Sequence, residues 1–191
     1  MTRRIAIYGG SFDPFHLGHL VPIVRAQETF LFESVYFVPA GSPPHKNAAP
    51  LTPVTHRLAM VAMATLPYEN FFTSDDEVFA PQPTFSVETV RRFRDRFPES
   101  TIYFILGSDS FSQIASWEMW EELVDSVHLV VLHRAHMWGK ELEQRVPERL
   151  LPRLKLVEPF EEVSEPEELT IYLLNHCLLY TSDAADECPA V

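Results

Sequence analysis

Two histidines, His16 and His19, stand where their side chains could act on a phosphate group. They follow a continuously apolar run, residues 5–8, and two glycines, and apolar residues at helical spacing begin directly after them. Because they are three residues apart at the start of a helix, the two imidazoles can face the same side of its first turn. A helix N-terminus also carries unpaired N–H groups and a partial positive charge, which attract anions. The pair therefore indicates an anion site, and two structural histidines with local hydrogen bonds are the less favoured alternative.

Strands and helices alternate along the chain, and their order determines where the histidines lie. The strand-like runs are residues 5–8, 35–38, 71–73, 102–106, 127–132, 154–157 and 171–174. The helical patterns are residues 18–33, 54–66, 86–96, 117–124 and 141–150. This alternation predicts a single α/β domain, a Rossmann-like open parallel sheet with helices on both faces. Such sheets bind ligands at the carboxyl ends of strands where the strand order reverses, so we expect residues 9–19 to line a crevice.

Length and composition set further bounds on the protein. The 191 residues suit one domain with a sizeable core, and the apolar share of 46% is ordinary for a globular protein. No apolar stretch approaches the roughly 20 residues of a membrane helix, and the N-terminus runs into the first strand without a signal-peptide core. The two cysteines, Cys177 and Cys188, lie near the C-terminus, so we expect no disulfide framework. These features predict a cytoplasmic protein with no membrane partner.

The net charge of −12 argues against a nucleic-acid partner, because nucleic-acid-binding surfaces are basic. It does not exclude a small anionic ligand, since a local cluster of His, Lys and helix ends can bind phosphate within an acidic protein. The sequence leaves the oligomeric state open, including a homo-oligomer.

Several motifs occur in a fixed order along the chain, and together they resemble a known family. They are GGSFDPFHLGH at residues 9–19, PPHK at 43–46, HRLAM at 56–60, PTFSVETV at 83–90, ILGSDSF at 105–111, Trp117, and VVLHR at 130–134. This series is similar to the nucleotidyltransferases with an HxGH motif, and within them to the bacterial nicotinate-nucleotide adenylyltransferases. The similarity extends from about Arg4 to His176.

The resemblance implies transfer of AMP from ATP to nicotinate mononucleotide, which gives nicotinate adenine dinucleotide and pyrophosphate in NAD biosynthesis. The phosphate of the mononucleotide is itself a competent nucleophile, so catalysis can consist of positioning and of stabilising charge on the α-phosphate. His16 and His19 are then the expected catalytic residues, because their imidazoles can donate hydrogen bonds to this phosphate. Mg²⁺ is expected to arrive with the ATP phosphates and to need few protein ligands, so no dedicated metal site is predicted.

The resemblance also places the ATP contacts on two loops that each follow a strand. The predicted ATP-binding residues are Gly9, Gly10, Ser11, Phe12, His16, Gly18, His19, Gly107, Ser108 and Asp109. A carboxylate at Asp109 suits the ribose hydroxyls because it accepts hydrogen bonds. His45 and Lys46 are expected to bind the phosphates, and the alternative for Lys46 is a solvated surface lysine.

The predicted mononucleotide-binding residues are Arg57, Thr84, Phe85, Ser86, Trp117 and Arg134. Trp117 is the expected ring platform, because a cationic pyridinium gains cation–π attraction as well as contact area on an indole. The alternative for Trp117 is a core tryptophan. Hydroxyl or backbone N–H groups at Thr84 and Ser86 could donate to the pyridine carboxylate, or the two hydroxyls could cap the next helix. Arg57 could contact the same ligand or be a surface arginine of a helix.

The sequence departs from this family in two places. Phe85 and Glu88 stand where the family has Tyr and Asp, and these changes are mild. The family's Ser-Ser/Ala-Thr-x-Ile-Arg motif, which opens a triphosphate-binding helix, does not follow residues 171–174. Residues 177–191 instead resemble translated sequencing-adapter DNA and hold no basic residue. We therefore expect a nucleotidyltransferase domain over residues 1–176, a non-native tail over residues 177–191, and low turnover for the chain as it stands.

Two other functions stay open at this point. One is a sibling nucleotidyltransferase that acts on another phosphate acceptor, such as pantetheine phosphate or a cytidylyl acceptor. The other is a nucleotide-binding module with little turnover, which the missing motif would produce. The combination of Trp117 with residues 83–86 favours nicotinate mononucleotide as the acceptor.

Overall fold

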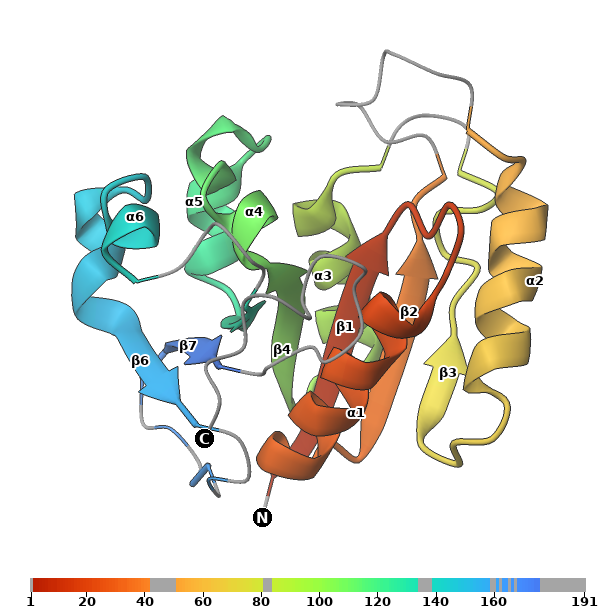
Figure 1. The fold of residues 1–191 in the computed structure, drawn as a ribbon, viewed down its shortest axis with the longest axis horizontal. Helices are drawn as coiled ribbons and strands as arrows, with labels where there is room; N and C mark the ends of the chain where they lie inside the picture. Colours follow the sequence, from red (N-terminus) through yellow and green to blue (C-terminus); the bar gives the residue numbers. More distant parts are fainter. Residues whose placement is uncertain are drawn as a thin grey trace, which may run out of the picture.

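Seven parallel strands form one sheet in the computed structural model, which describes residues 2–41, 51–80, 84–133, 139–158, 161, 163, 164, 166 and 168–175. The strand order is β3-β2-β1-β4-β5-β7-β6, and all neighbouring strands pair in parallel (Figure 1). The bounds are β1 Arg3–Gly10, β2 Ser34–Pro39, β3 Phe71–Thr73, β4 Ser100–Gly107, β5 His128–Leu132, β6 Leu154–Val157 and β7 Ile171–Leu174. Each predicted strand-like run coincides with one of these strands to within two residues at either end. The α/β prediction is therefore confirmed.

Helices connect most of the strands. Their bounds are α1 Leu17–Phe30, α2 Val54–Thr65, α3 Ser86–Arg96, α4 Ser108–Phe111, α5 Trp120–Val124 and α6 Lys140–Glu143, with 3₁₀ helices η1 Ile114–Ser116 and η2 Glu148–Arg153. The single helix predicted over residues 141–150 is wrong, because Pro147 has no N–H to continue it and instead precedes η2. Trp117 lies before α5 and not inside it. In the part of the chain that the structure describes, no helix is long and apolar enough to cross a membrane.

The sheet has an apolar core on each of its faces. Alternate residues of β1 belong to different cores, Ile5 and Ile7 to one and Ala6 and Tyr8 to the other. Apolar residues of α3, α5 and α6 complete the first core, and those of α1 and α2 complete the second (Figure 1). Because both faces of β1 are covered, its sequence is continuously apolar and does not alternate.

The strand order reverses at β1. From β1 the chain passes outward through β2 to β3, and it then returns to the other side of β1 as β4. Tyr8 of β1 pairs with Ile105 of β4, and Gly10 pairs with Pro39 of β2. The carboxyl ends of these three strands therefore lie together at the position where open parallel sheets bind their ligands.

His128, the first residue of β5, makes the stability of this fold depend on pH. Its side chain is buried, its ring stacks on Tyr103 with centroids 4.9 Å apart, and its Nδ1 accepts a hydrogen bond from Thr170 N–H at 3.1 Å. Burial, with smaller contributions from Arg153 and Arg4, lowers the pKa of His128 from 6.5 to about 4. Between these two values the unfolded chain binds a proton that the folded protein does not. The stabilisation is therefore complete above pH 6.5 and is lost as the pH falls towards 4.

We expect His128 to lower the free energy of unfolding by about 2 kcal/mol between about pH 8 and about pH 5. His128→Asn keeps an acceptor for the Thr170 N–H but does not titrate in this range. Urea unfolding at the two pH values measures this free energy. Between them, the free energy of unfolding should decrease by about 2 kcal/mol less in the variant than in the wild type. Equal decreases in the two proteins would contradict this explanation.

Candidate active site

A cavity of about 500 Å³ opens at the carboxyl ends of β1, β2 and β4. Its volume is within the usual range of small-molecule sites, roughly 300–1,000 Å³. The predicted site residues that line it are Gly9, Gly10, Ser11, Phe12, His16, His19, Thr84, Phe85, Ser86, Gly107, Asp109 and Trp117. The fold thus brings together residues from motifs that are about a hundred positions apart in the sequence.

His16 and His19 form the first side of the cavity. His16 directly precedes α1, and its carbonyl accepts hydrogen bonds from the N–H groups of His19 at 2.8 Å and Leu20 at 3.2 Å. This turn brings the two imidazole rings to 4.0 Å between centroids. His16 is exposed and His19 is half-buried. A ligand in the cavity can therefore meet two ring N–H donors beside the N-terminus of a 14-residue helix.

Aromatic side chains hold the ring of His19. It stacks on Phe15 with centroids 5.5 Å apart, and it meets Phe12 edge-on at 5.4 Å. Phe12 is itself buried in the core beside α1. Because these rings restrict its rotation, His19 presents its donor in one direction, and preorganised donors stabilise developing charge most effectively. Phe15 is a supporting residue that the sequence pattern does not single out.

Two glycines leave room that a side chain would fill. A Cβ atom at Gly10 would lie 2.7 Å from the ring of Phe12, and one at Gly18 would lie 2.9 Å from the ring of His16. Real Cβ atoms essentially never make contacts this short, so any larger residue would displace these rings. Gly18 is not among the described lining residues. A side chain at Gly18 would collide with the ring of His16, and the contact of Gly18 with ATP stays a prediction.

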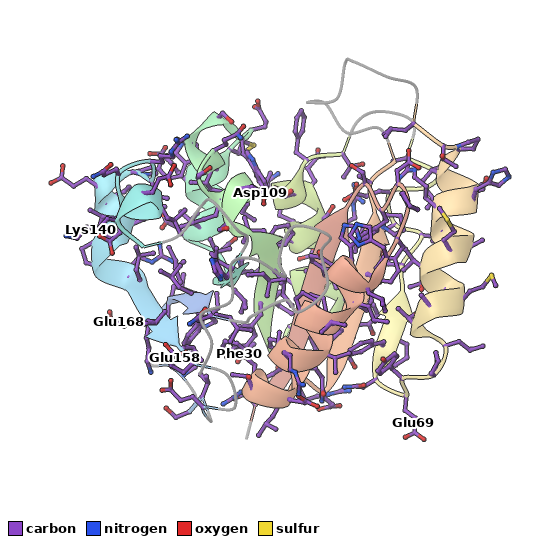
Figure 2. The ribbon with its side chains drawn as sticks, in the orientation of Figure 1. Phe30, Glu69, Asp109, Lys140, Glu158 and Glu168 are labelled. Carbon is purple, nitrogen blue, oxygen red and sulfur yellow. The ribbon has the colours of Figure 1, made fainter. Side chains whose placement is uncertain are left out.

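The junction of β4 and α4 forms the second side of the cavity. Gly107 and Asp109 line it, and Figure 2 shows Asp109, the second residue of α4, at this end of the sheet. Asp109 is exposed, so its carboxylate can accept hydrogen bonds from a ligand. Ser108 is fully buried and is not among the described lining residues. Protein atoms surround the side chain of Ser108, and its contact with ATP stays a prediction.

The start of α3 forms the third side. Thr84, Phe85 and Ser86 line the cavity, and Phe85 directly precedes the helix. The N–H of Phe85 donates to the carboxylate of Glu88 at 3.0 Å, and no side-chain cap is present at the residue before the helix. The alternative in which Thr84 or Ser86 caps α3 is thus not what the structure shows. Glu88, which stands where the family has Asp, therefore has a local structural role: its carboxylate accepts the hydrogen bond that closes the turn before α3.

Trp117 belongs to the cavity and to the core at once. Its indole meets the ring of Phe104 edge-on, with centroids 6.4 Å apart and planes at 90°. It packs against the core on the α3 side of the sheet. It is also partly exposed and lines the cavity together with Phe85. Trp117 therefore combines both interpretations: part of its indole packs in the core, and part faces the cavity, where a ring could stack on it.

Arg57 is the predicted site residue whose place differs most from its prediction. It is only 1% exposed and is not among the described lining residues. Its guanidinium donates to the backbone carbonyls of Thr52 at 2.9 Å, Ser11 at 2.5 Å, Ala40 at 2.8 Å and Gly41 at 3.4 Å. Neither a mononucleotide contact nor a surface arginine describes it, because the side chain is buried and every nitrogen bonds the protein's own backbone.

Glu77 is a lining residue that the sequence does not single out. Its carboxylate accepts hydrogen bonds from the hydroxyl of Thr89 at 2.6 Å and from the backbone N–H of Gly41. Burial raises the pKa of Glu77, against the effect of these two donors. In the sequence nothing distinguishes Glu77 from the adjacent acids Asp75 and Asp76, and only the folded structure shows that it lines the cavity. The other lining residues outside the prediction are Tyr8, Asp13, Pro14, Val38, Ala40, Phe104, Leu106, Ser110 and Glu118.

The described lining offers more carboxylates than cationic groups. Its ionisable side chains include Asp13, Glu77, Asp109, Glu118, His16 and His19, and the lining residues that the structure describes contain no Lys or Arg. Within the described ranges, no three His, Cys, Asp or Glu side chains cluster as a metal site. The predicted basic contacts His45, Lys46 and Arg134 lie outside the described residues, as do residues 177–191.

A parallel α/β sheet with two histidines at a helix start beside its switch point has the arrangement of a Rossmann-like nucleotidyltransferase, in which a phosphate group can meet the histidines and the helix N-terminus. The cytidylyltransferase-like family matches residues 7–170 of this chain. A Symbiobacterium thermophilum protein described as "Probable nicotinate-nucleotide adenylyltransferase" is 39% identical over 153 residues, 79% of this chain and 72% of that protein. A Methylacidiphilum infernorum protein with the same description is 33% identical over 156 residues, 81% of this chain and 75% of that protein.

Solved structures share the fold. The Plasmodium falciparum nicotinic acid mononucleotide adenylyltransferase complexed with NaAD has a TM-score of 0.66 and 22% identity, over 95% of this chain and 78% of that chain. Its complex with APC has a TM-score of 0.67 and 21% identity over the same shares. The chain belongs to the cytidylyltransferase-like family, within its nicotinate-nucleotide adenylyltransferases.

Proposed function

We propose that this protein transfers AMP from ATP to nicotinate mononucleotide and releases pyrophosphate, as a nicotinate-nucleotide adenylyltransferase. The observation that carries the proposal is a single cavity lined both by the pair His16 and His19 and by Trp117 with the start of α3. The histidines suit a phosphate under attack, and the other side suits a pyridine ring that bears a carboxylate. The descriptions of the relatives support the same reaction.

The reaction forms one bond at the α-phosphorus of ATP and breaks another. A phosphate oxygen of the mononucleotide attacks this phosphorus, and the bond to the β-phosphate oxygen breaks, so pyrophosphate leaves with the electron pair. The attacking oxygen is already ionised, so the reaction needs no protein base and no protein nucleophile. Negative charge grows around the α-phosphate, and we assign its stabilisation to the ring N–H donors of His16 and His19.

The acceptor side of the cavity supplies contact area and directional donors. A pyridinium ring on the indole of Trp117 gains cation–π attraction in addition to apolar contact. The first N–H groups of α3 can donate to the pyridine carboxylate, as can the hydroxyls of Thr84 and Ser86. Hydrogen bonds to a carboxylate are stronger than those to a neutral amide, so this side favours nicotinate over nicotinamide.

The described lining contains no Lys or Arg that could neutralise the charge of the triphosphate. We propose that Mg²⁺ enters with the ATP phosphates and neutralises part of their charge when bound. The lining fits such an ion, because Asp13 offers the hard carboxylate oxygen that Mg²⁺ prefers. His45 and Lys46 are the proposed basic contacts to the phosphates, and Arg134 to the mononucleotide. Because the reaction consumes ATP, we also propose a cytoplasmic location.

The test of the proposal is turnover by the purified chain with ATP, Mg²⁺ and one acceptor at a time. The acceptors are nicotinate mononucleotide, nicotinamide mononucleotide and pantetheine phosphate, and both the nucleotide product and the released pyrophosphate are measured. Fastest product formation from nicotinate mononucleotide supports the proposal. Faster transfer to pantetheine phosphate would identify a sibling activity and overturn it. Calorimetric binding of ATP with no transfer to any acceptor would overturn it in favour of a binding module.

A further inference from the structure

Arg57, in the first turn of α2, joins backbone segments that border the cavity. Its Nη1 donates to the carbonyl of Ser11 at 2.5 Å, and its Nη2 donates to that of Ala40 at 2.8 Å. Ser11 and Ala40 both line the cavity, although Arg57 does not. Its Nε holds the carbonyl of Thr52, at the entry to α2, at 2.9 Å. Figure 1 shows the start of α2 at the same end of the sheet as the loop between β1 and α1.

A second hydrogen bond also joins the loop between β1 and α1 to the residues before α2. The Oδ2 atom of Asp13 accepts a hydrogen bond from the backbone N–H of Thr52 at 2.9 Å. Thr52 is therefore bonded both to Arg57 and to the loop that leads to His16. Burial lowers the pKa of Arg57, and the nearby charge of Asp13 opposes this effect. Asp13 thus favours the charged guanidinium, whose hydrogen bonds are about twice as strong as neutral ones.

The loop between β1 and α1 needs such a hold. Phe12, the residue after Ser11, has a φ of +50°, a left-handed backbone conformation that costs free energy in a residue other than glycine. Such a conformation persists where surrounding contacts fix it. The hydrogen bond from Arg57 to Ser11 and that from Thr52 to Asp13 hold the residues on either side of Phe12.

We infer that Arg57 is a positioning residue for the proposed adenylyl transfer, because it fixes the loop between β1 and α1 so that His16 and His19 meet the phosphate in one geometry. The inference rests on the proposed function. A displacement of about 1 Å at a reacting group can lower a rate by about a hundredfold, so a loop held at Ser11 has a direct effect on the histidines that follow it.

Arg4 offers a matched comparison for a purely structural arginine. Its Nη1 donates to the carbonyls of Phe30 at 2.9 Å and Val163 at 2.8 Å. These bonds lie at the amino end of β1, and neither carbonyl belongs to a described lining residue. Substitution of Arg57 and of Arg4 therefore separates an effect on the site from a general loss of stability.

The experiment compares Arg57→Lys with Arg4→Lys, each of which keeps the charge and removes some of the bonds to carbonyls. We expect both variants to lower Tm, but only Arg57→Lys to lower kcat, by about tenfold or more, with KM values for ATP and nicotinate mononucleotide within about threefold. Hydrogen exchange read by mass spectrometry reports on the loop without turnover. The backbone amides of residues 11–13, 15 and 16 should exchange faster in Arg57→Lys and at the wild-type rate in Arg4→Lys.

The inference would be overturned if Arg4→Lys lost as much kcat as Arg57→Lys for the same decrease in Tm. Unchanged exchange at residues 11–16 in Arg57→Lys would also overturn it. Arg57→Met removes every donor and should lower kcat and speed exchange at the loop more than Arg57→Lys does. If Arg57→Met does not fold, Arg57→Lys alone tests the inference. A wild-type chain without adenylyl transfer contradicts the proposed function itself. Exchange at residues 11–16 then tests the hold of Arg57 on the loop separately from turnover.

Discussion

Replacing His16 with alanine is expected to lower kcat by about 10²–10³-fold, the usual effect of losing one donor that stabilises developing charge. The fold should remain intact, because His16 is exposed and its removal costs little packing. KM values should change little, since the donor acts mainly on charge that grows at the α-phosphate during transfer. Steady-state release of pyrophosphate measures the first effect, and the thermal unfolding midpoint measures the second.

His19 requires a different substitution, because its ring packs against Phe12 and Phe15. His19→Phe keeps an aromatic ring in this position and removes the N–H donor, so a similar loss of kcat is expected. His56, which is exposed on α2, is the matched control, and His56→Ala should leave kcat within about twofold of the wild type. Near-wild-type turnover in His16→Ala or in His19→Phe would remove that histidine from the catalytic assignment.

Trp117→Ala is expected to weaken the binding of nicotinate mononucleotide by about 1–3 kcal/mol, roughly five- to 150-fold in Kd. The reason is the loss of the aromatic face that lines the acceptor side of the cavity. ATP affinity should change little, because its proposed contacts lie on the side of His16 and Asp109. Calorimetric titration with each ligand separately measures both affinities.

Controls distinguish a binding role of Trp117 from a packing role. Trp117→Phe keeps an aromatic face and should retain most of the mononucleotide affinity. Trp120, whose ring lies 5.2 Å from the guanidinium of Arg149, is not among the described lining residues, so Trp120→Ala should leave both affinities unchanged. If Trp117→Ala loses affinity for both ligands equally, or loses its cooperative melting transition, the core interpretation of this tryptophan is the correct one.

The strands could be predicted because a parallel sheet buried on both faces requires continuous apolar runs, and these are visible in a single sequence. The helices were predicted less well where local effects compete. Pro147 interrupts the pattern of residues 141–150, and the short helix α4 directly follows β4, where residues 108–111 give too few turns for a helical period. Apolar spacing therefore located the sheet and left the short elements beside the cavity undetermined.

The histidine pair could be predicted because its geometry is local, set by a spacing of three residues at a helix start. Arg57 could not, because its partners Ser11 and Ala40 are 46 and 17 residues away and its burial depends on how α2 docks. A buried arginine and an exposed one look the same within a helical pattern. Glu77 shows the same limit, since its contacts with Gly41 and Thr89 are made only by the folded chain.

The central place of β1 has a consequence for synthesis of the chain. Ile5 pairs with Ser34 on one side and with Ile102 on the other. A nascent chain can therefore pair β1 with β2, and β2 with β3, while the second edge of β1 stays open until β4 has left the ribosome. Open apolar edges invite pairing with other chains. Asp109 and Trp117 also lie after β4 in the chain, so the lining of the cavity is complete only once these residues have been synthesised.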